Sequence, residues 1–131
     1  MNGNITYVEP DATEWFEFRP GSRWQILFED PSTGQRAVLV EWEPGYSMGA
    51  VDRHERDEVV FVLAGTFVQD GRACGPGTYI HHWAGSQHQA STPDGCKFLE
   101  IVTGHPERSG AVNEDQLAWF RSLVTCSPRH R

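Results

Sequence analysis

RHERDEVVFVLAG, residues 53–65, places a cluster of charged and metal-capable side chains directly before a long apolar run. The apolar run, residues 59–63, is rich in Val and Phe, which favour a pleated, half-buried strand. Residues of equal parity share a face in an extended chain, so Asp52, His54 and Glu58 are predicted to point the same way. A neutral imidazole and a carboxylate are typical ligands of a divalent first-row metal. On this stretch alone, a charged surface turn is the alternative interpretation.

Short strand-like segments separated by turns recur on both sides of this stretch. Asp-Gly pairs at 70–71 and 94–95 are strong turn signals. A domain of many short antiparallel strands must hide its sheet edges, so the sequence predicts an all-β sandwich or barrel. The predicted strands are 24–29, 36–43, 59–63, 66–69, 78–82 and 97–103.

One helix is predicted near the C-terminus, over residues 113–124. Asn113 can cap its first turn, and Leu117, Phe120 and Val124 repeat on one face. We expect this helix to lie on the outside of the sheet structure.

The composition narrows the classes of protein that the chain can belong to. A length of 131 residues, 38% of them hydrophobic and 22% charged, fits one globular domain. The formal net charge of −7 disfavours nucleic acid and anionic membrane surfaces as partners. No apolar run approaches the ~20 residues of a membrane span, and the N-terminal residues lack the apolar core of a signal peptide. The sequence therefore predicts a cytoplasmic protein. Its three cysteines lack CxxC spacing, which favours neither a disulfide framework nor a thiolate zinc site.

A second polar stretch, GTYIHHWAGSQHQAST at residues 77–92, holds three of the six histidines, His81, His82 and His88. Its turn residues predict a strand, a bend and a new strand that starts near His88. A single histidine is more often a hydrogen-bonded or exposed residue than a metal ligand. Together with the stretch at 53–65, however, these histidines form a candidate metal site.

The stretch at 53–65 resembles the first motif of the cupin family, G(X)5HXH(X)3-4E(X)6G. His54, Glu58 and Gly65 keep the spacing of this motif, whereas Asp52 stands where the family has its first histidine. The leading glycine also departs from the pattern, because six residues separate Gly45 from Asp52.

The stretch at 77–92 resembles the second cupin motif, G(X)5PXG(X)2H(X)3N. Gly77, Gly85 and His88 keep its spacing, with Trp83 in place of the proline and Thr92 in place of the asparagine. The two motifs occur in order and are separated by 11 residues, which makes the pair far more specific than either motif alone.

Finer detail, in DEVVFVLAGTF at 57–67 and GPGTYIHH at 75–82, resembles the ChrR-type cupins. This domain type occurs in a zinc-binding anti-sigma factor and in small dioxygenases of the acetylacetone and dihydroxyacetophenone dioxygenase kind. The resemblance implies a single cupin, or jelly-roll, barrel, with the barrel core at about 24–104 of a one-domain chain.

In the family, the motif histidines and the glutamate hold a metal inside the barrel, which implies His54, Glu58 and His88 as ligands here. Asp52 leaves three alternatives. In the first, Asp52 donates an oxygen and gives a site that suits Fe(II), Mn(II) or Zn(II). In the second, His81 or His82 replaces the missing ligand, since one of the two must face inward. In the third, Asp52 is a rim residue of a degenerate site.

The resemblance implies a metal-dependent enzyme, in the first place an Fe(II) dioxygenase acting on a small diketone, hydroxy-ketone or phenolic compound, with Zn(II) or Mn(II) as the other candidate metals. Tyr79 or His81 is then the candidate proton donor, and Asp52 a candidate ligand or base. One alternative is a non-redox isomerase, cyclase or lyase. Another is a non-catalytic ligand- or metal-binding module, although the anti-sigma factors carry an additional helical zinc-binding domain before the cupin. A homodimer is expected from the resemblance and from the need to cover sheet edges.

Overall fold

The apolar run of the opening stretch forms one strand of a curled antiparallel sheet in the computed structural model, which describes residues 3–53 and 55–103. Within these residues, one short 3-10 helix, η1 (Pro10–Ala12), precedes the strands. The strands are β1 (Phe16–Arg19), β2 (Ser22–Asp30), β3 (Gln35–Trp42), β4 (Asp52–Arg53), β5 (Glu58–Gly65), β6 (Phe67–Gln69), β7 (Arg72–Cys74), β8 (Tyr79–His82), β9 (Gln87–His88), β10 (Ala90–Ser91) and β11 (Cys96–Val102).

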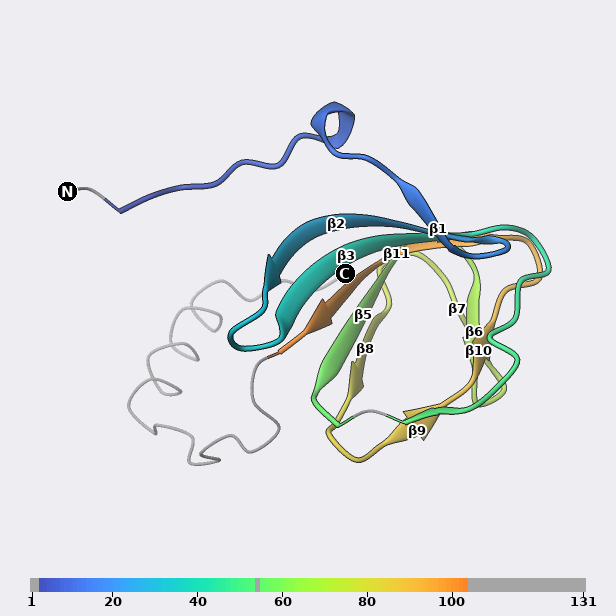
Figure 1. Ribbon diagram of the computed structural model, residues 1–131. Helices are drawn as coiled ribbons and strands as arrows, with labels where there is room; N and C mark the ends of the chain where they lie inside the picture. The colour runs from blue at the N-terminus through green and yellow to red at the C-terminus, as the bar shows by residue number, and fades with distance from the viewer. Residues whose placement is uncertain (1–2, 54, 104–131) are drawn as a thin grey trace, which may run out of the picture.

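The strands are arranged as a barrel (Figure 1). The main sheet has six strands in the order β1-β2-β3-β11-β5-β8, a smaller sheet has the order β10-β6-β7, and β4 pairs with β9. In Figure 1 the long strands β2, β3 and β11 arch over the top, β5 and β8 descend on one side, and β6, β7 and β10 stand opposite them. β9 lies at the lower end, and the N-terminal arm extends away from the barrel.

Alternation along the long strands directs one set of side chains into the barrel. In β3 the buried residues are Val38, Val40 and Trp42, at every second position. The register places Phe98 of β11 opposite Val40 of β3 on one side and Val62 of β5 on the other. The row of apolar side chains that results, across three strands, lies in the hydrophobic core.

Aromatic side chains fill one end of the barrel. The rings of Trp42, Phe67 and Phe98 pack against one another with centroid distances of 5.0–5.5 Å. The indole nitrogen of Trp42 donates a hydrogen bond of 3.0 Å to the Ser22 hydroxyl, which satisfies its one buried polar group. Polar side chains face inward at the opposite end of the barrel, and Glu58, at the start of β5, is one of them.

Gly65 shows why the first motif ends in glycine. Its φ is +75°, a conformation that side chains with a Cβ rarely adopt. A Cβ at this position would overlap the carbonyl oxygen of Gly95 and lie 2.7 Å from Cys96 Cα. β5 and β11 therefore approach each other closely only because residue 65 has no side chain.

The predicted all-β architecture is confirmed, and each of the six predicted strands coincides with one of β2, β3, β5, β6, β8 and β11. The sequence did not predict β1, β4, β7 and β10, which are two to four residues long and carry too little alternation to be recognised. The helix expected at 113–124 lies outside the described residues. Across residues 3–53 and 55–103, no helix has the length and apolar character needed to span a membrane.

Candidate metal centre

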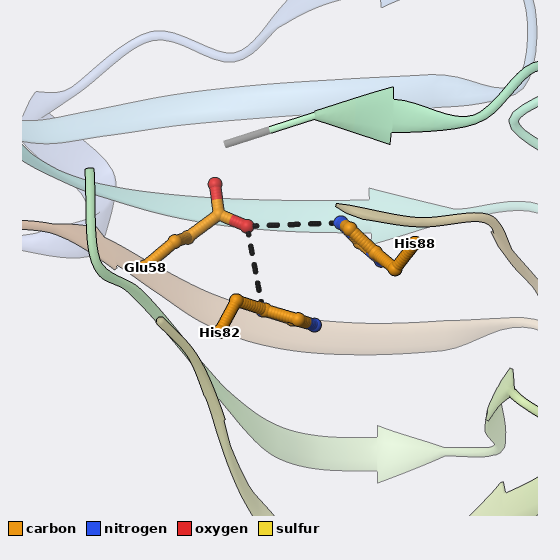
Figure 2. Close-up of side chains that lie close together, drawn as sticks. All are labelled: Glu58, His82 and His88. Carbon is orange, nitrogen blue, oxygen red and sulfur yellow. Dashed lines mark ion pairs between the residues drawn. The ribbon is translucent and has the colours of Figure 1, made fainter. Parts of the chain in front are cut away.

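Three buried side chains from three strands meet at the polar end of the barrel: Glu58, His82 and His88. Glu58 begins β5 and His82 ends β8, and the antiparallel register places the two directly opposite each other. β9 carries His88, which reaches the same point because the chain bends after β8, where Ser86 N donates a hydrogen bond of 2.9 Å to Trp83 O. Figure 2 shows the Glu58 carboxylate facing both imidazole rings.

The geometry of these three side chains fits a metal ion. Glu58 Oε1 lies 3.7 Å from His82 Nδ1 and 3.9 Å from His88 Nε2, and one ligand atom from each residue lies within 4.8 Å of the others. Ligands at about 2.0–2.1 Å from a tetrahedral cation are roughly 3.4 Å apart, so a small contraction would bring these atoms to bonding distance. Two imidazoles and a carboxylate are also the donor set that divalent first-row metals prefer.

Gln69 of β6 orients both imidazole rings. Its Oε1 lies 2.6 Å from His88 Nδ1 and 3.2 Å from His82 Nε2. A carbonyl oxygen only accepts hydrogen bonds, so when it accepts from both rings, the lone pairs of His88 Nε2 and His82 Nδ1 face Glu58. The Gln69 amide nitrogen is also 3.0 Å from His82 Nε2, which allows the other tautomer of His82 in the absence of a metal. The first arrangement is the one that a cation would select.

The buried carboxyl of Glu58 is strongly perturbed. Burial is the largest cause, and together with the negative charge of Glu100 and a hydrogen bond with it, burial raises the pKa of Glu58 from 4.5 to about 10. The charge of Asp52 acts in the same direction, whereas Arg36 lowers the pKa. Without a cation, Glu58 therefore holds a proton at neutral pH, and a bound divalent cation would supply the positive charge that the ionised carboxylate needs.

A cavity of about 270 Å³ opens next to the three side chains and is bordered by Glu58 and His88. Most of its wall is apolar, as in typical small-molecule pockets. The main apolar contributors are Trp24, Trp42, Tyr46, Met48, Phe67 and Phe98. In the part of the chain that the structure describes, the other ionisable side chains on its surface are Arg19, Arg36, Asp52 and Glu100.

The structure brings together two of the predicted ligands, Glu58 and His88, and adds His82, one of the two histidines that were left open as replacements. Asp52 lies opposite His88 in the β4–β9 pair and borders the cavity, but it is not part of the group of three. His54 lies outside the described residues, so its predicted role as a ligand stays a prediction.

Tyr79 and His81 are not brought to this group, although they were predicted as proton donors. Alternation along β8 turns His82 inward and these two side chains to the outer face, where Tyr79 is 60% exposed. There His81 Nε2 lies 3.0 Å from Asp57 Oδ2, and its Nδ1 lies 3.5 Å from the Tyr79 hydroxyl. Asp57 Oδ1 accepts a hydrogen bond of 2.8 Å from Ala84 N, so this outer group holds the bend between β8 and β9.

Sequence reasoning missed Gln69, Arg36 and Glu100, which belong to neither motif. The sequence nevertheless carries a pattern that could have indicated each of these residues. All three are polar residues at inward parity on apolar strands: Gln69 follows Phe67 by two positions, and Glu100 follows Phe98 by two. Polar groups at such positions need partners inside the barrel, and this makes them candidates for the site.

Comparisons with known proteins agree with this fold. The sequence matches the family described as the ChrR cupin-like domain over residues 4–106. No curated protein matches the chain.

Solved structures of similar fold include an RmlC-like cupin from Shewanella frigidimarina, with 22% identity and a TM-score of 0.68, covering 82% of this chain and 97% of that one. An acetylacetone dioxygenase from Acinetobacter johnsonii has 18% identity and a TM-score of 0.63, covering 92% and 93%. The complex of Rhodobacter sphaeroides SigE with the anti-sigma ChrR has 20% identity and a TM-score of 0.61, covering 72% of this chain and 51% of that one.

Proposed function

The chain belongs to the ChrR cupin-like domain family, and from this and the buried Glu58–His82–His88 group we propose that it is a metal-dependent enzyme acting on a small organic substrate. More specifically, we propose an Fe(II) dioxygenase acting on a diketone, hydroxy-ketone or phenolic compound. The observation that carries the proposal is the meeting of two imidazoles and one carboxylate, of which His88 and Glu58 border a cavity with apolar walls.

The donor set fits the proposed Fe(II), and it fits Zn(II) as well. Two histidines and one carboxylate with open positions are typical of non-haem Fe(II) oxygenases. When bound, such a metal would supply adjacent positions for dioxygen and for a chelating substrate. Asp52, at the cavity rim, and His54 remain candidates for further ligands. The acetylacetone dioxygenase among the structural neighbours agrees in kind with this proposal.

The residues of the chain would prepare the site in three ways. Glu58, His82 and His88 hold the cation, and Gln69 fixes the ring orientations through hydrogen bonds to both imidazoles. The apolar wall excludes water from bound substrate, which strengthens every electrostatic interaction at the site. A substrate of the size of one substituted ring or smaller suits a cavity of about 270 Å³.

One observation favours a second candidate function, a non-redox isomerase, cyclase or lyase. Glu100 borders the cavity and shares a hydrogen bond with Glu58, so a carboxyl group able to accept or donate a proton lies beside the candidate metal. The same metal would then polarise a substrate carbonyl.

Metal analysis is the first experiment. Protein purified without chelator, or reconstituted anaerobically with Fe(II), is expected to hold one metal ion per chain. His82→Ala and His88→Ala should abolish this binding, whereas the matched variant His81→Ala should retain it, because His81 lies on the outer face. Wild-type protein that takes up no divalent metal, or a His82→Ala variant that binds normally, would overturn the proposal.

Dioxygen dependence separates the two candidate reactions. Fe(II)-loaded protein is offered acetylacetone and a dihydroxyacetophenone, and dioxygen uptake is followed with an electrode alongside substrate loss. Equal consumption of dioxygen and substrate is the expected result. Substrate loss that continues under anaerobic conditions would exclude the dioxygenase and support the second candidate.

The homodimer expected from the resemblance remains a proposal. Sedimentation of the purified protein at two concentrations would check it, and a monomer at both concentrations would exclude it.

A further inference from the structure

Arg36 is a cationic side chain at an inward position of β3, whose other inward positions hold the apolar residues Val38, Val40 and Trp42. It has the same parity along β3 as the buried residues Val38 and Val40. The register places it opposite Val102 of β11, which in turn lies opposite Glu58 of β5. Arg36 and Glu58 therefore occupy one row across three strands, about 10 Å apart at their Cα atoms, and both border the cavity.

The guanidinium group of Arg36 is held in place on one side and has an unused donor. Its Cζ lies over the ring of Trp24, 5.7 Å from the centroid, in a cation–π contact. Its Nε is buried, and among the described residues no acceptor lies within hydrogen-bonding reach. A buried N–H without an acceptor is unfavourable, so the described protein atoms do not satisfy all the donors of this guanidinium group.

The charges around the cavity also favour an anion. Among residues 3–53 and 55–103, the ionisable side chains that border it, apart from His88, are Arg19, Arg36, Asp52, Glu58 and Glu100. With the three carboxylates ionised and a divalent cation bound, two guanidinium groups leave one net positive charge. Without Arg36 the net charge would be zero. Arg36 therefore offsets the carboxylates that would otherwise disfavour an anionic substrate.

We propose that Arg36 is a substrate-binding residue that makes the cavity selective for a small planar monoanion, such as a carboxylate or an enolate. An anionic oxygen of the substrate lies between the candidate metal and the guanidinium group, and its apolar body packs against the wall that includes Trp24 and Phe98. The planar fork of an arginine matches the two oxygens of a carboxylate. The inference rests on the proposed metal site and names the substrate class for it.

Calorimetry on zinc-loaded protein tests this inference, because Zn(II) supports binding without oxidation. Salicylate and salicylamide serve as probes, since both have the same ring and hydroxyl group and differ in charge. Arg36→Gln is expected to weaken salicylate binding about 10- to 100-fold, in line with the loss of a hydrogen bond to a charged group, and to change salicylamide binding less than about twofold. Arg36→Lys keeps the charge and should retain part of the affinity. The matched control Arg72→Gln, on an exposed residue of β7, should leave both affinities unchanged.

Zinc content is measured before each titration, which separates loss of the metal site from loss of the anion site. If wild-type protein binds no zinc, the proposed function fails and the anion site fails with it. If zinc binds but Arg36→Gln and Arg36→Lys hold salicylate as tightly as wild type, or lose both probes equally, only the role of Arg36 is overturned. Zinc-loaded wild type that binds no salicylate would also overturn it.

Discussion

Replacing Gln69 with leucine removes the amide that contacts both candidate metal-binding histidines and leaves the three proposed ligands unchanged. In the protein, Gln69 Oε1 lies 2.6 Å from His88 Nδ1 and 3.2 Å from His82 Nε2. Leucine has a similar volume but cannot accept a hydrogen bond. Both rings would lose the contact that directs their lone pairs toward Glu58.

The size of the effect follows from the role of hydrogen bonds around metal ligands. Loss of such an outer contact costs about 10- to 100-fold in metal affinity, or about 1.4–2.8 kcal/mol. The metal-free protein should also lose stability, because an imidazole N–H without an acceptor in a buried site costs about 1–3 kcal/mol. Gln69→Glu keeps an acceptor oxygen for each ring, so its affinity for zinc should fall less than that of Gln69→Leu.

Competition with a chromophoric chelator measures the zinc affinity, and urea denaturation of the metal-free variants measures stability. Gln89→Leu is the matched control, since residue 89 is exposed and adjoins His88 in the sequence. Gln69→Leu protein that is folded and binds zinc as tightly as wild type would refute the role of Gln69.

Three further predictions concern stability and reactivity. Burial raises the pKa of the Cys96 thiol from 9.0 to about 11, so any stability that this thiol contributes is present below pH 9.0 and is lost as the pH rises through about 11. Its alkylation by iodoacetamide in folded protein should be about 100-fold slower than that of an unperturbed thiol, and mass spectrometry showing rapid labelling would contradict this. Phe67→Ala should lower the free energy of unfolding, measured by urea denaturation, by about 3–5 kcal/mol. Phe28→Ala is the control, because Phe28 is half-exposed, and an equally small loss for both variants would argue against the aromatic packing around Phe67. Gly65→Ala should lower the melting temperature more than Gly71→Ala, because both glycines have a positive φ but only a Cβ at residue 65 meets other atoms; equal losses would contradict the close approach of β5 and β11.

The strands that the sequence predicted correctly are those with a clear alternation of apolar residues. Long strands such as β3 and β11 have enough alternating apolar residues to be recognised, and turn residues mark their ends. The resemblance to the two cupin motifs identified Glu58 and His88, because both residues stand at the positions of ligands in those motifs.

The alternation of side chains along a strand could not decide whether His81 or His82 faces the inside of the barrel. Adjacent residues of a strand always face opposite sides, so the sequence required one of them to point inward but did not say which. The pairing of β8 with β5 decides this, because it places His82 opposite Glu58. A shift of one residue in that register would have exchanged the two histidines.

The sequence by itself determined the all-β class, the main strands and two of the three side chains in the candidate metal centre, because these depend on periodicity and on spacing along the chain. Only the tertiary structure decided that Gln69 holds both imidazoles and that Arg36 faces the same cavity as Glu58. These residues come from strands that are distant in sequence. Their meeting depends on the register and closure of the barrel, which no single stretch of the chain records.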